Sequence, residues 1–259
     1  MTSACRWLVA PLLFSLGLAA VACGDDRDDA EGATRRSLHV FAAASLTEVF
    51  GELSDAFERD HPDTTIRFNF AASSALAQQI NGGARADVFV SADESTMAKV
   101  TAAGIAVRPE TMARNRLAIL VERGNPKAID GLVDLANPDV LLVLCAPAVP
   151  CGALAAAALQ HAGVHAKPSS LEENVKAVVS RVTLGEADAG IVYVTDVKAA
   201  GDNAEGVNID SANEPRFEAV YPVAMTRAAT NRDGALQWID FVLSDRGQAI
   251  LRSFGFVAP

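Results

Sequence analysis

The sequence predicts an α/β protein of two lobes, each a mainly parallel sheet covered by helices. Two observations carry this prediction. Short apolar runs with strand character alternate along the chain with segments of helical periodicity, an order typical of parallel sheets whose faces are covered by helices. The 259 residues are 50% hydrophobic and 21% charged, a composition that can fill the core of one large domain or two modest ones.

The first series of elements extends from Leu38 to Gly104. We expect strands at 38–42, 65–70 and 86–91, and helices at 46–60, 76–80 and 93–103. The first helix is indicated by apolar residues at helical spacing, namely Leu46, Val49, Phe50, Leu53 and Phe57. Glycines follow the second and third helices and supply their stops.

A second series begins at Arg116 and continues to the end of the chain. We expect strands at 116–121, 140–145, 189–194 and 219–225, and helices at 152–161, 171–184, 233–243 and 246–254. No linker rich in glycine, serine or proline separates the two series, which disfavours a flexible tandem. A single doubly wound domain and two lobes joined by strand crossings both fit the length. We favour two lobes, with the C-terminal helices returning to the first lobe. Lobe I then comprises 37–115 plus 222–259, and lobe II comprises 116–221.

The N-terminal segment predicts export. Arg6 is the only charge before Asp25, and residues 7–24 form an uncharged, mostly apolar run. A single basic residue followed by an apolar stretch with a small-residue end is typical of a secretory signal. A transmembrane anchor is the alternative, for which the run is at the short limit.

Residues 20–23, Ala-Val-Ala-Cys, resemble the lipobox of bacterial lipoproteins. The resemblance implies that 1–22 is a signal peptide and that Cys23 carries lipid. The acidic segment 23–36 would then be a flexible tether. The exported protein would be anchored at the outer face of the cytoplasmic membrane or lie in the periplasm.

The charge of the chain excludes one class of partner. Lys and Arg total 22 against 32 Asp and Glu, a formal net charge of −10 with an isoelectric point near 4.9. Binding of nucleic acid requires a basic face, so we expect no nucleic-acid partner. The same charge makes long-range attraction of an anion implausible.

The sequence contains none of the common motifs of catalysis or nucleotide binding. It has no G-x-G-x-x-G after a strand, no G-x-x-x-x-G-K-[ST], no G-x-S-x-G and no H-E-x-x-H. Its four histidines have no partner at the spacing of a metal site or a catalytic triad. We therefore expect no catalytic residue, no cofactor and no enzymatic activity.

Two cysteines remain for the folded part, Cys145 and Cys151. They flank a turn, Ala-Pro-Ala-Val-Pro, that can return the chain on itself, and disulfides are permitted outside the cytoplasmic membrane. We favour a disulfide between them, and two free buried thiols are the alternative. A metal site would lack ligands, because no histidine is near.

Small residues and hydroxyls gather where predicted strands lead into helices. Such turns lie at 43–48, 71–75, 149–152 and 169–173, and Tyr193 ends a strand. Taken singly, each serine reads as an ordinary helix cap, and both Ser45 with Glu48 and the fourth turn have the spacing of a capping box. Taken together, the turns place several helix N-termini on one side of a sheet, where their unpaired N–H groups suit an anion.

Four stretches show a more specific resemblance: VFAAASLTEVF, FAASSALAQQINGGARADVFVSAD, GIVYVTD and DRGQAILRSFGF. The sequence resembles the periplasmic molybdate-binding proteins of ABC importers over nearly everything from Leu38 to Phe256. The resemblance implies a two-lobed periplasmic-binding-protein fold of type II that closes over one tetrahedral dianion.

By their positions in the chain, the resemblance assigns five residues to the oxyanion. Ser45 and Ser73 would contact it through their hydroxyl and backbone N–H groups. Cys151 and Val175 would offer backbone N–H groups, and Tyr193 its phenol. Cys151 departs from the family pattern, which often has alanine there, but a backbone donor tolerates the change. The only metal expected is the molybdenum of bound molybdate, held through these residues.

The expected function is that of a lipid-anchored, monomeric receptor that captures molybdate or tungstate and passes it to the permease of an ABC importer. Neutral donors bind such a dianion without a buried Arg or Lys, which reconciles the site with an acidic chain. The alternatives are a receptor for another oxyanion such as sulfate, a secreted hydrolase with Ser45 or Ser73 as nucleophile, and a sensor domain that reports to a separate protein.

Overall fold

The computed structural model describes residues 36–209 and 214–259. The predicted signal peptide, Cys23 and almost all of the predicted tether therefore lie outside the described residues. Within these two ranges, no helix combines the length and the apolar character that a membrane span requires.

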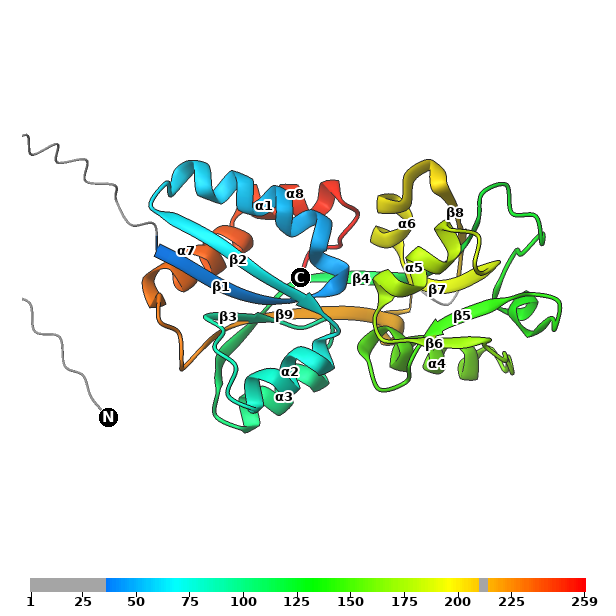
Figure 1. Ribbon diagram of the computed structural model, residues 1–259, viewed down its shortest axis with the longest axis horizontal. Coiled ribbons are helices and arrows are strands. Elements are labelled where there is room, and N and C mark those ends of the chain that lie inside the picture. The colour runs from blue at the N-terminus through cyan, green and yellow to red at the C-terminus, as the bar shows by residue number, and fades with distance from the viewer. Residues whose placement is uncertain (1–35, 210–213) are drawn as a thin grey trace, which may run out of the picture. The chain divides into compact units, whose positions relative to one another are not determined.

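Strands and helices alternate in the described chain (Figure 1). The strands are β1 (Arg36–Ala43), β2 (Thr64–Ala71), β3 (Val88–Val90), β4 (Ala106–Glu122), β5 (Leu142–Cys145), β6 (Ser170–Glu172), β7 (Ala189–Tyr193), β8 (Ala204–Asn208) and β9 (Glu218–Thr226). The α-helices are α1 (Thr47–Asp60), α2 (Ser73–Asn81), α3 (Glu94–Ala102), α4 (Pro150–His161), α5 (Val175–Thr183), α6 (Val194–Ala200), α7 (Arg232–Leu243) and α8 (Asp245–Ser253). Short 3-10 helices are η1 (Ala44–Leu46), η2 (Leu132–Ala136), η3 (Gly201–Asn203) and η5 (Pro215–Phe217).

The strands follow one another in the order β2-β1-β3-β9-β4-β7-β5-β6, and β8 pairs with β4. The pairs β1–β2, β1–β3, β5–β6 and β5–β7 are parallel, whereas β4 and β9 in the middle run antiparallel to their neighbours. The predicted fold class, α/β with parallel sheets under helices, is confirmed.

One long strand, β4, serves both halves of this strand order. It pairs with β9 between Ala106 and Arg116, and with β7 and β8 between Leu117 and Glu122. Sequence periodicity predicted only 116–121 as strand. The preceding residues are largely polar, and they are extended because β9 pairs with them, with register shifts on either side of Glu110 and Thr111.

The half that contains β1, β2 and β3 is covered by helices from both ends of the chain. Trp238 of α7 is fully buried and meets Phe50 and Phe57 of α1 edge-on, with ring centroids 5.6 and 5.4 Å apart. The helices α2 and α3 cover the opposite face around a second apolar cluster that includes Leu76 and Phe89 (Figure 1). The last helices thus fix the position of α1, which follows the first turn after β1.

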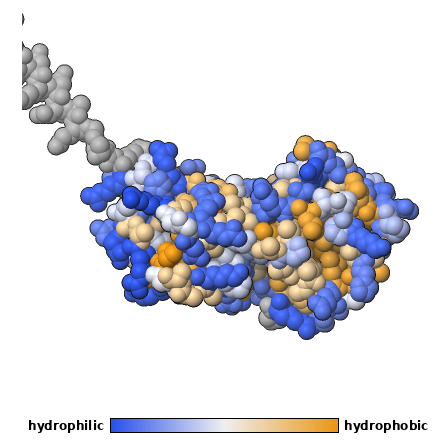
Figure 2. All heavy atoms as spheres, turned by 60° about the horizontal axis from the view of Figure 1, so that its bottom comes forward, coloured by the Kyte–Doolittle hydropathy of each residue, from blue (hydrophilic) through white to orange (hydrophobic). Residues whose placement is uncertain are grey.

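Large hydrophobic residues stay exposed mainly on the half that contains β5 to β8. Those exposed in the described ranges are Val133, Leu141, Leu171, Leu184, Val194 and Leu236. In Figure 2 apolar side chains gather on that same half, on the right of the view. Scattered exposed residues of this kind are normal for a protein surface and do not mark a functional site.

Candidate functional site

A small cavity of about 20 Å³ lies where segments from both halves meet. Its lining includes all five residues that the sequence assigned to an oxyanion, namely Ser45, Ser73, Cys151, Val175 and Tyr193. The other lining residues are Ala43, Ala44, Ala72, Ala92, Val149, Pro150 and Asn174. No Asp, Glu, Lys, Arg or His belongs to this set. The structure therefore brings the five residues to one place and surrounds them with small, uncharged neighbours.

Ser45 lies in η1, directly after β1, and it is 4% exposed. Its expected role as the N-cap of a capping box with Glu48 is wrong: α1 has Leu46 as its N-cap, without a side-chain cap. Ser45 lies within the 3-10 turn that precedes α1 and is not the residue that caps α1. As a result the Ser45 hydroxyl lies 2.9 Å from the hydroxyl of Tyr221, and Glu48 pairs with Lys176.

Ser73 is the first residue of α2 and is almost fully buried. Its Oγ accepts a hydrogen bond from the backbone N–H of Ala92 at 2.9 Å. The hydroxyl proton of Ser73 is then directed elsewhere, because that bond uses the oxygen as an acceptor. Because Ser73 also lines the cavity, its hydroxyl proton is available for an acceptor bound there.

Cys151 lies in the first turn of α4 and is joined to Cys145 at the end of β5 by a disulfide, with the Cα atoms 5.9 Å apart. The following residue, Gly152, has no room for a side chain: a Cβ there would lie 2.0 Å from the carbonyl oxygen of Ala146. The helix begins at Pro150, two residues earlier than expected, and proline suits the first turn because its missing N–H needs no partner there. The disulfide and the lack of a side chain at Gly152 together allow residues 145–146 to lie close to the start of α4.

Val175 is the first residue of α5, and Asn174 caps this helix by accepting the N–H of Ala177 at 3.1 Å. The predicted helix at 171–184 and the capping box in 169–173 are both wrong at this point. Residues 170–172 form β6, which pairs with β5, and the Ser170 hydroxyl donates to Glu172. Pairing with the edge of the sheet delays the helix by four residues and places its N-terminus at the cavity.

Tyr193, the last residue of β7, is 1% exposed, and its hydroxyl has no hydrogen-bond partner among the described residues. Burial, followed by the nearby Tyr221, Asp196 and Asp93, raises the pKa of Tyr193 well above 10. The phenol therefore stays protonated and can donate. A buried polar group without a partner costs about 1 to 3 kcal/mol, so the unpaired hydroxyl indicates a ligand that accepts from it.

The N-termini of α2, α4 and α5 all lie at this cavity. The first N–H groups of a helix have no partner within the helix, and the helix dipole adds partial positive charge there. The cavity thus has hydroxyl and backbone N–H groups as hydrogen-bond donors, and these suit an anion that only accepts hydrogen bonds.

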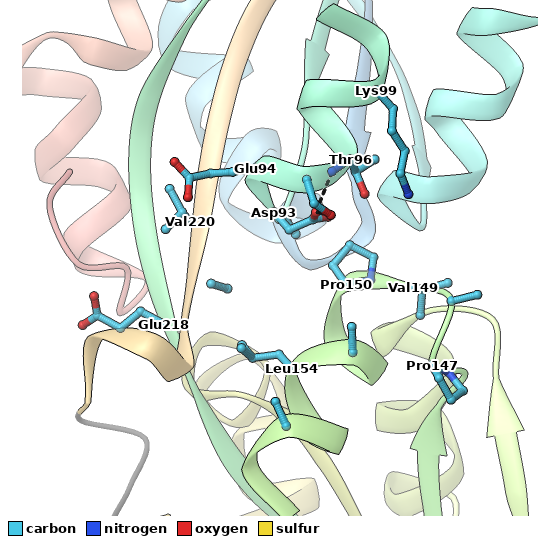
Figure 3. A pocket seen from close by; sticks show the side chains of 16 residues that line it. Asp93, Glu94, Thr96, Lys99, Pro147, Val149, Pro150, Leu154, Glu218 and Val220 are labelled. Atoms are coloured by element: carbon cyan, nitrogen blue, oxygen red, sulfur yellow. Dashed lines mark hydrogen bonds between the residues drawn. The ribbon is translucent and has the colours of Figure 1, made fainter. Parts of the chain in front are cut away.

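A larger cavity, about 610 Å³, adjoins the small one and shares Ala92, Val149 and Pro150 with it (Figure 3). Its charged lining residues are Asp93, Glu94, Lys99 and Glu218. Asp93 caps α3 by accepting the N–H of Thr96 at 2.7 Å. We interpret this larger, acidic space as the open approach to the small, neutral one.

Sequence reasoning missed three residues close to the site: Lys176, Asp196 and Tyr221. Lys176 and Tyr221 gave no local signal, because each reads as an ordinary helix or strand residue. Asp196 lies within a quoted motif, but its role depends on partners: it accepts the N–H of Tyr193 at 3.1 Å and pairs with Lys176 at 2.8 Å. Within the described ranges, no group of three or more His, Cys, Asp and Glu side chains is arranged to hold a metal ion.

The alternative of a serine hydrolase has no support at this site. The oxygens of Ser45 and Ser73 contact Tyr221 and the N–H of Ala92, and neither serine has a histidine or carboxylate among its partners in the described chain.

Comparison with known proteins places these features in a family. Residues 38–257 match the family model of the bacterial extracellular solute-binding proteins. The molybdate-binding protein ModA of Mycobacterium tuberculosis is 37% identical, over 98% of this chain and 100% of that protein. The solved structure of the periplasmic molybdate-binding protein of Azotobacter vinelandii superposes with a TM-score of 0.73 at 22% identity, and covers 86% of this chain and 99% of that one.

The same fold also occurs in a protein that is named for another anion. The sulfate-binding protein SubI of Mycobacterium tuberculosis superposes with a TM-score of 0.72 at 17% identity, over 85% of this chain and 86% of that one. At this identity the likeness shows the fold alone, so the superposition does not identify the anion. The match over 38–257 and the identity along nearly the full chain do identify the family: the chain belongs to the bacterial extracellular solute-binding proteins, which bind and do not catalyse.

Proposed function

We propose that this protein is an extracytoplasmic receptor that captures molybdate, and tungstate with it, and delivers the anion to the permease of an ABC importer. The observation that carries the proposal is the buried, unpaired hydroxyl of Tyr193 in an uncharged cavity lined by helix N-termini. The 37% identity to a molybdate-binding protein supports the choice of anion.

The chemistry of the lining favours a fully deprotonated, tetrahedral oxyanion. Such an anion offers only acceptors, and the lining offers hydroxyl and N–H donors without a charged side chain. An anion that keeps a proton, such as hydrogen phosphate, needs an acceptor in addition, and no carboxylate lines the small cavity. Neutral donors also avoid the cost of burying an Arg or Lys beside the ligand.

Capture between two lobes is part of the proposal. Lobe I would comprise 37–115 and 222–259, and lobe II 116–221, with hinges where β4 and β9 pass between them. Binding then closes the lobes, because the anion contacts donors from both and favours the closed form by its differential affinity. A monomer suffices, since all five proposed contacts come from one chain.

We further propose a lipid anchor on Cys23, which would keep the receptor beside its permease. The support is the lipobox-like Ala-Val-Ala-Cys at 20–23. Replacement Cys23→Ser should release the protein from membranes into the soluble fraction and abolish its labelling by a fatty-acid probe. Persistence of both would contradict the anchor.

The anion-binding proposal is tested by titration calorimetry with molybdate, tungstate, sulfate and phosphate. We expect molybdate and tungstate to bind at least about 100-fold more tightly than the other two, a difference of about 2.7 kcal/mol. Preference for sulfate would support the second candidate, a sulfate receptor, for which the fold of SubI gives precedent. No binding of any of the four anions would overturn the function.

Variants then test the assignment of the site. Ser45→Ala with Ser73→Ala should lower the molybdate affinity by about 100-fold, and Tyr193→Phe by about 10-fold or more, because hydrogen bonds to a charged group are worth about 1.5 to 3 kcal/mol. The matched control is Ser54→Ala, an α1 serine whose hydroxyl donates to the carbonyl of Gly51. Unchanged affinity in folded site variants would show that the anion binds elsewhere.

A further inference from the structure

The side chain of Lys176 joins the two halves of the protein beside the small cavity. Its Nζ lies 2.7 Å from Glu48 Oε2 on α1 and 2.8 Å from Asp196 Oδ1 on α6. Glu48 belongs to the half built on β1, whereas Lys176 and Asp196 belong to the half built on β5 and β7. This triad therefore provides an ionic contact across the halves.

Each member of the triad belongs to a segment that lines the cavity. Glu48 follows Ser45 by three residues, Lys176 directly follows Val175, and Asp196 follows Tyr193 by three. Asp196 also accepts the backbone N–H of Tyr193 through its other oxygen, at 3.1 Å. The three segments that bring Ser45, Val175 and Tyr193 together are thus tied to one ammonium group.

We propose that Lys176 is a positioning residue for anion capture: it links Glu48 to Asp196 and so holds the two halves in the binding geometry. The inference rests on the proposed function, because it assigns to the triad the closure of that same site. Lys176 lines neither cavity and is not proposed to contact the anion.

The two contacts of Lys176 differ in burial, and this difference assigns them different roles. The Asp196 side chain is fully buried, while that of Glu48 is 41% exposed. A buried carboxylate left without its cation is costly, so the Lys176–Asp196 pair should persist whether the halves are together or apart. The exposed Glu48 contact is worth about 1 kcal/mol or less, so it can form and break as the halves move.

The charges of the triad make the proposal testable, because two possible roles of the triad predict opposite changes in anion affinity when the charge of Glu48 is removed. Two carboxylates and one ammonium carry a net charge of −1 close to the anion. If the triad acted only through its electric field, removing the Glu48 charge would tighten anion binding. If Lys176 holds the halves together through Glu48, the same change weakens binding.

The variant for this test is Glu48→Gln, which keeps the length of the side chain and leaves the buried pair intact. We expect molybdate to dissociate about threefold to fivefold faster and its Kd to rise by the same factor. The matched control is Glu52→Gln, an exposed carboxylate one turn further along α1, which should leave Kd unchanged or slightly lower. Equal or tighter binding by Glu48→Gln would overturn the role of Lys176.

A second measurement does not depend on the ligand. Spin labels at Asp55→Cys on α1 and Ala199→Cys on α6, both exposed positions, report the distance between the halves by pulsed electron resonance without anion. We expect Glu48→Gln to shift the distribution toward longer distances. Identical distributions with and without the change would reject the link. Failure of the wild type to bind any anion, together with a shift in distance, would reject the proposed function and keep the link.

Discussion

The hydroxyl of Ser45 lies 2.9 Å from the hydroxyl of Tyr221, although the two residues are 176 positions apart in the chain. Tyr221 is fully buried on β9, and this burial raises its pKa, although the hydrogen bond with Ser45 acts in the opposite direction. The phenol therefore stays protonated and can donate to Ser45. Ser45 then has its own proton available for an anion.

Replacing Tyr221 by Phe tests this orientation of the Ser45 hydroxyl. We expect Tyr221→Phe to lower the molybdate affinity about threefold to tenfold, because Ser45 loses one partner while keeping its place in η1. Calorimetry measures the loss. Ser45→Ala with Tyr221→Phe should be no weaker than Ser45→Ala alone; additive losses would mean that Tyr221 acts independently of Ser45.

The raised pKa values of the buried groups predict how binding and stability respond to pH. Since the pKa of Tyr193 lies well above 10, its donor is present at neutral and mildly alkaline pH. We expect the molybdate Kd to stay constant between about pH 6.5 and 9. A tenfold change in Kd within that range would indicate a titrating group in the site.

Above about pH 10 the same shifts should lower the free energy of unfolding. Burial alone would lower the pKa of Lys176, but Asp196 and Glu48 together outweigh it and raise the pKa above 10.5. The pKa values of Tyr193 and Tyr221 are raised as well. Groups with a raised folded pKa contribute stability below their unfolded pKa and lose it as the pH rises through the folded value. Urea denaturation at pH 8, 10 and 11 measures the free energy of unfolding, which should be lowest at pH 11.

The disulfide between Cys145 and Cys151 should affect anion binding as well as stability. Joining Cys151 to β5 restrains the first turn of α4, which lines the cavity. We expect Cys145→Ala with Cys151→Ala to lower the free energy of unfolding by about 2 kcal/mol and to speed molybdate release severalfold. Reduction of the wild type should reproduce both effects, and a reductant should not change the double variant. Unaltered release would restrict the disulfide to a structural role.

The acidic approach predicts an unusual effect of salt on the rate of association. Asp93 and Glu94 line the larger cavity with one cation, Lys99, while Glu218 in the same lining is paired with Arg114 and Arg116. Such a lining repels a dianion, and salt screens the repulsion, so we expect the association rate to rise with ionic strength. Stopped-flow fluorescence measures this slope, which Glu94→Gln should reduce. A rate that falls with salt would mean that cations steer the anion.

How far the site can be predicted from sequence depends on what determines the conformation of each residue. A local pattern can be read from the sequence, whereas a partner distant in the chain cannot. The five assigned residues all lie at ends of strands or starts of helices, and the family resemblance identified them even where periodicity placed the helix start at the wrong residue, as before Val175. The direction of a side chain is different: Ser45 has the spacing of a cap, yet Tyr221 and the turn of η1 direct it into the cavity.

The same limit applies to two parts of the fold. Residues 106–115 carry no strand pattern, and β9 makes them extended by pairing with them. The local pattern around Ser170–Glu172 predicts the start of a helix, but these residues pair with β5 and form the strand β6. In both places the partner comes from another part of the chain, and a local pattern holds no information about it.

The position of β9 between β3 and β4 has a consequence for the order of folding. The half that begins the chain is completed by β9, by α7 and α8, and by Val257, which pairs with Arg114. The segment that forms β5 to β8 is continuous and is synthesised before those elements. Contacts of such long sequence separation form slowly, so the half that is synthesised first should be the last to reach its native packing.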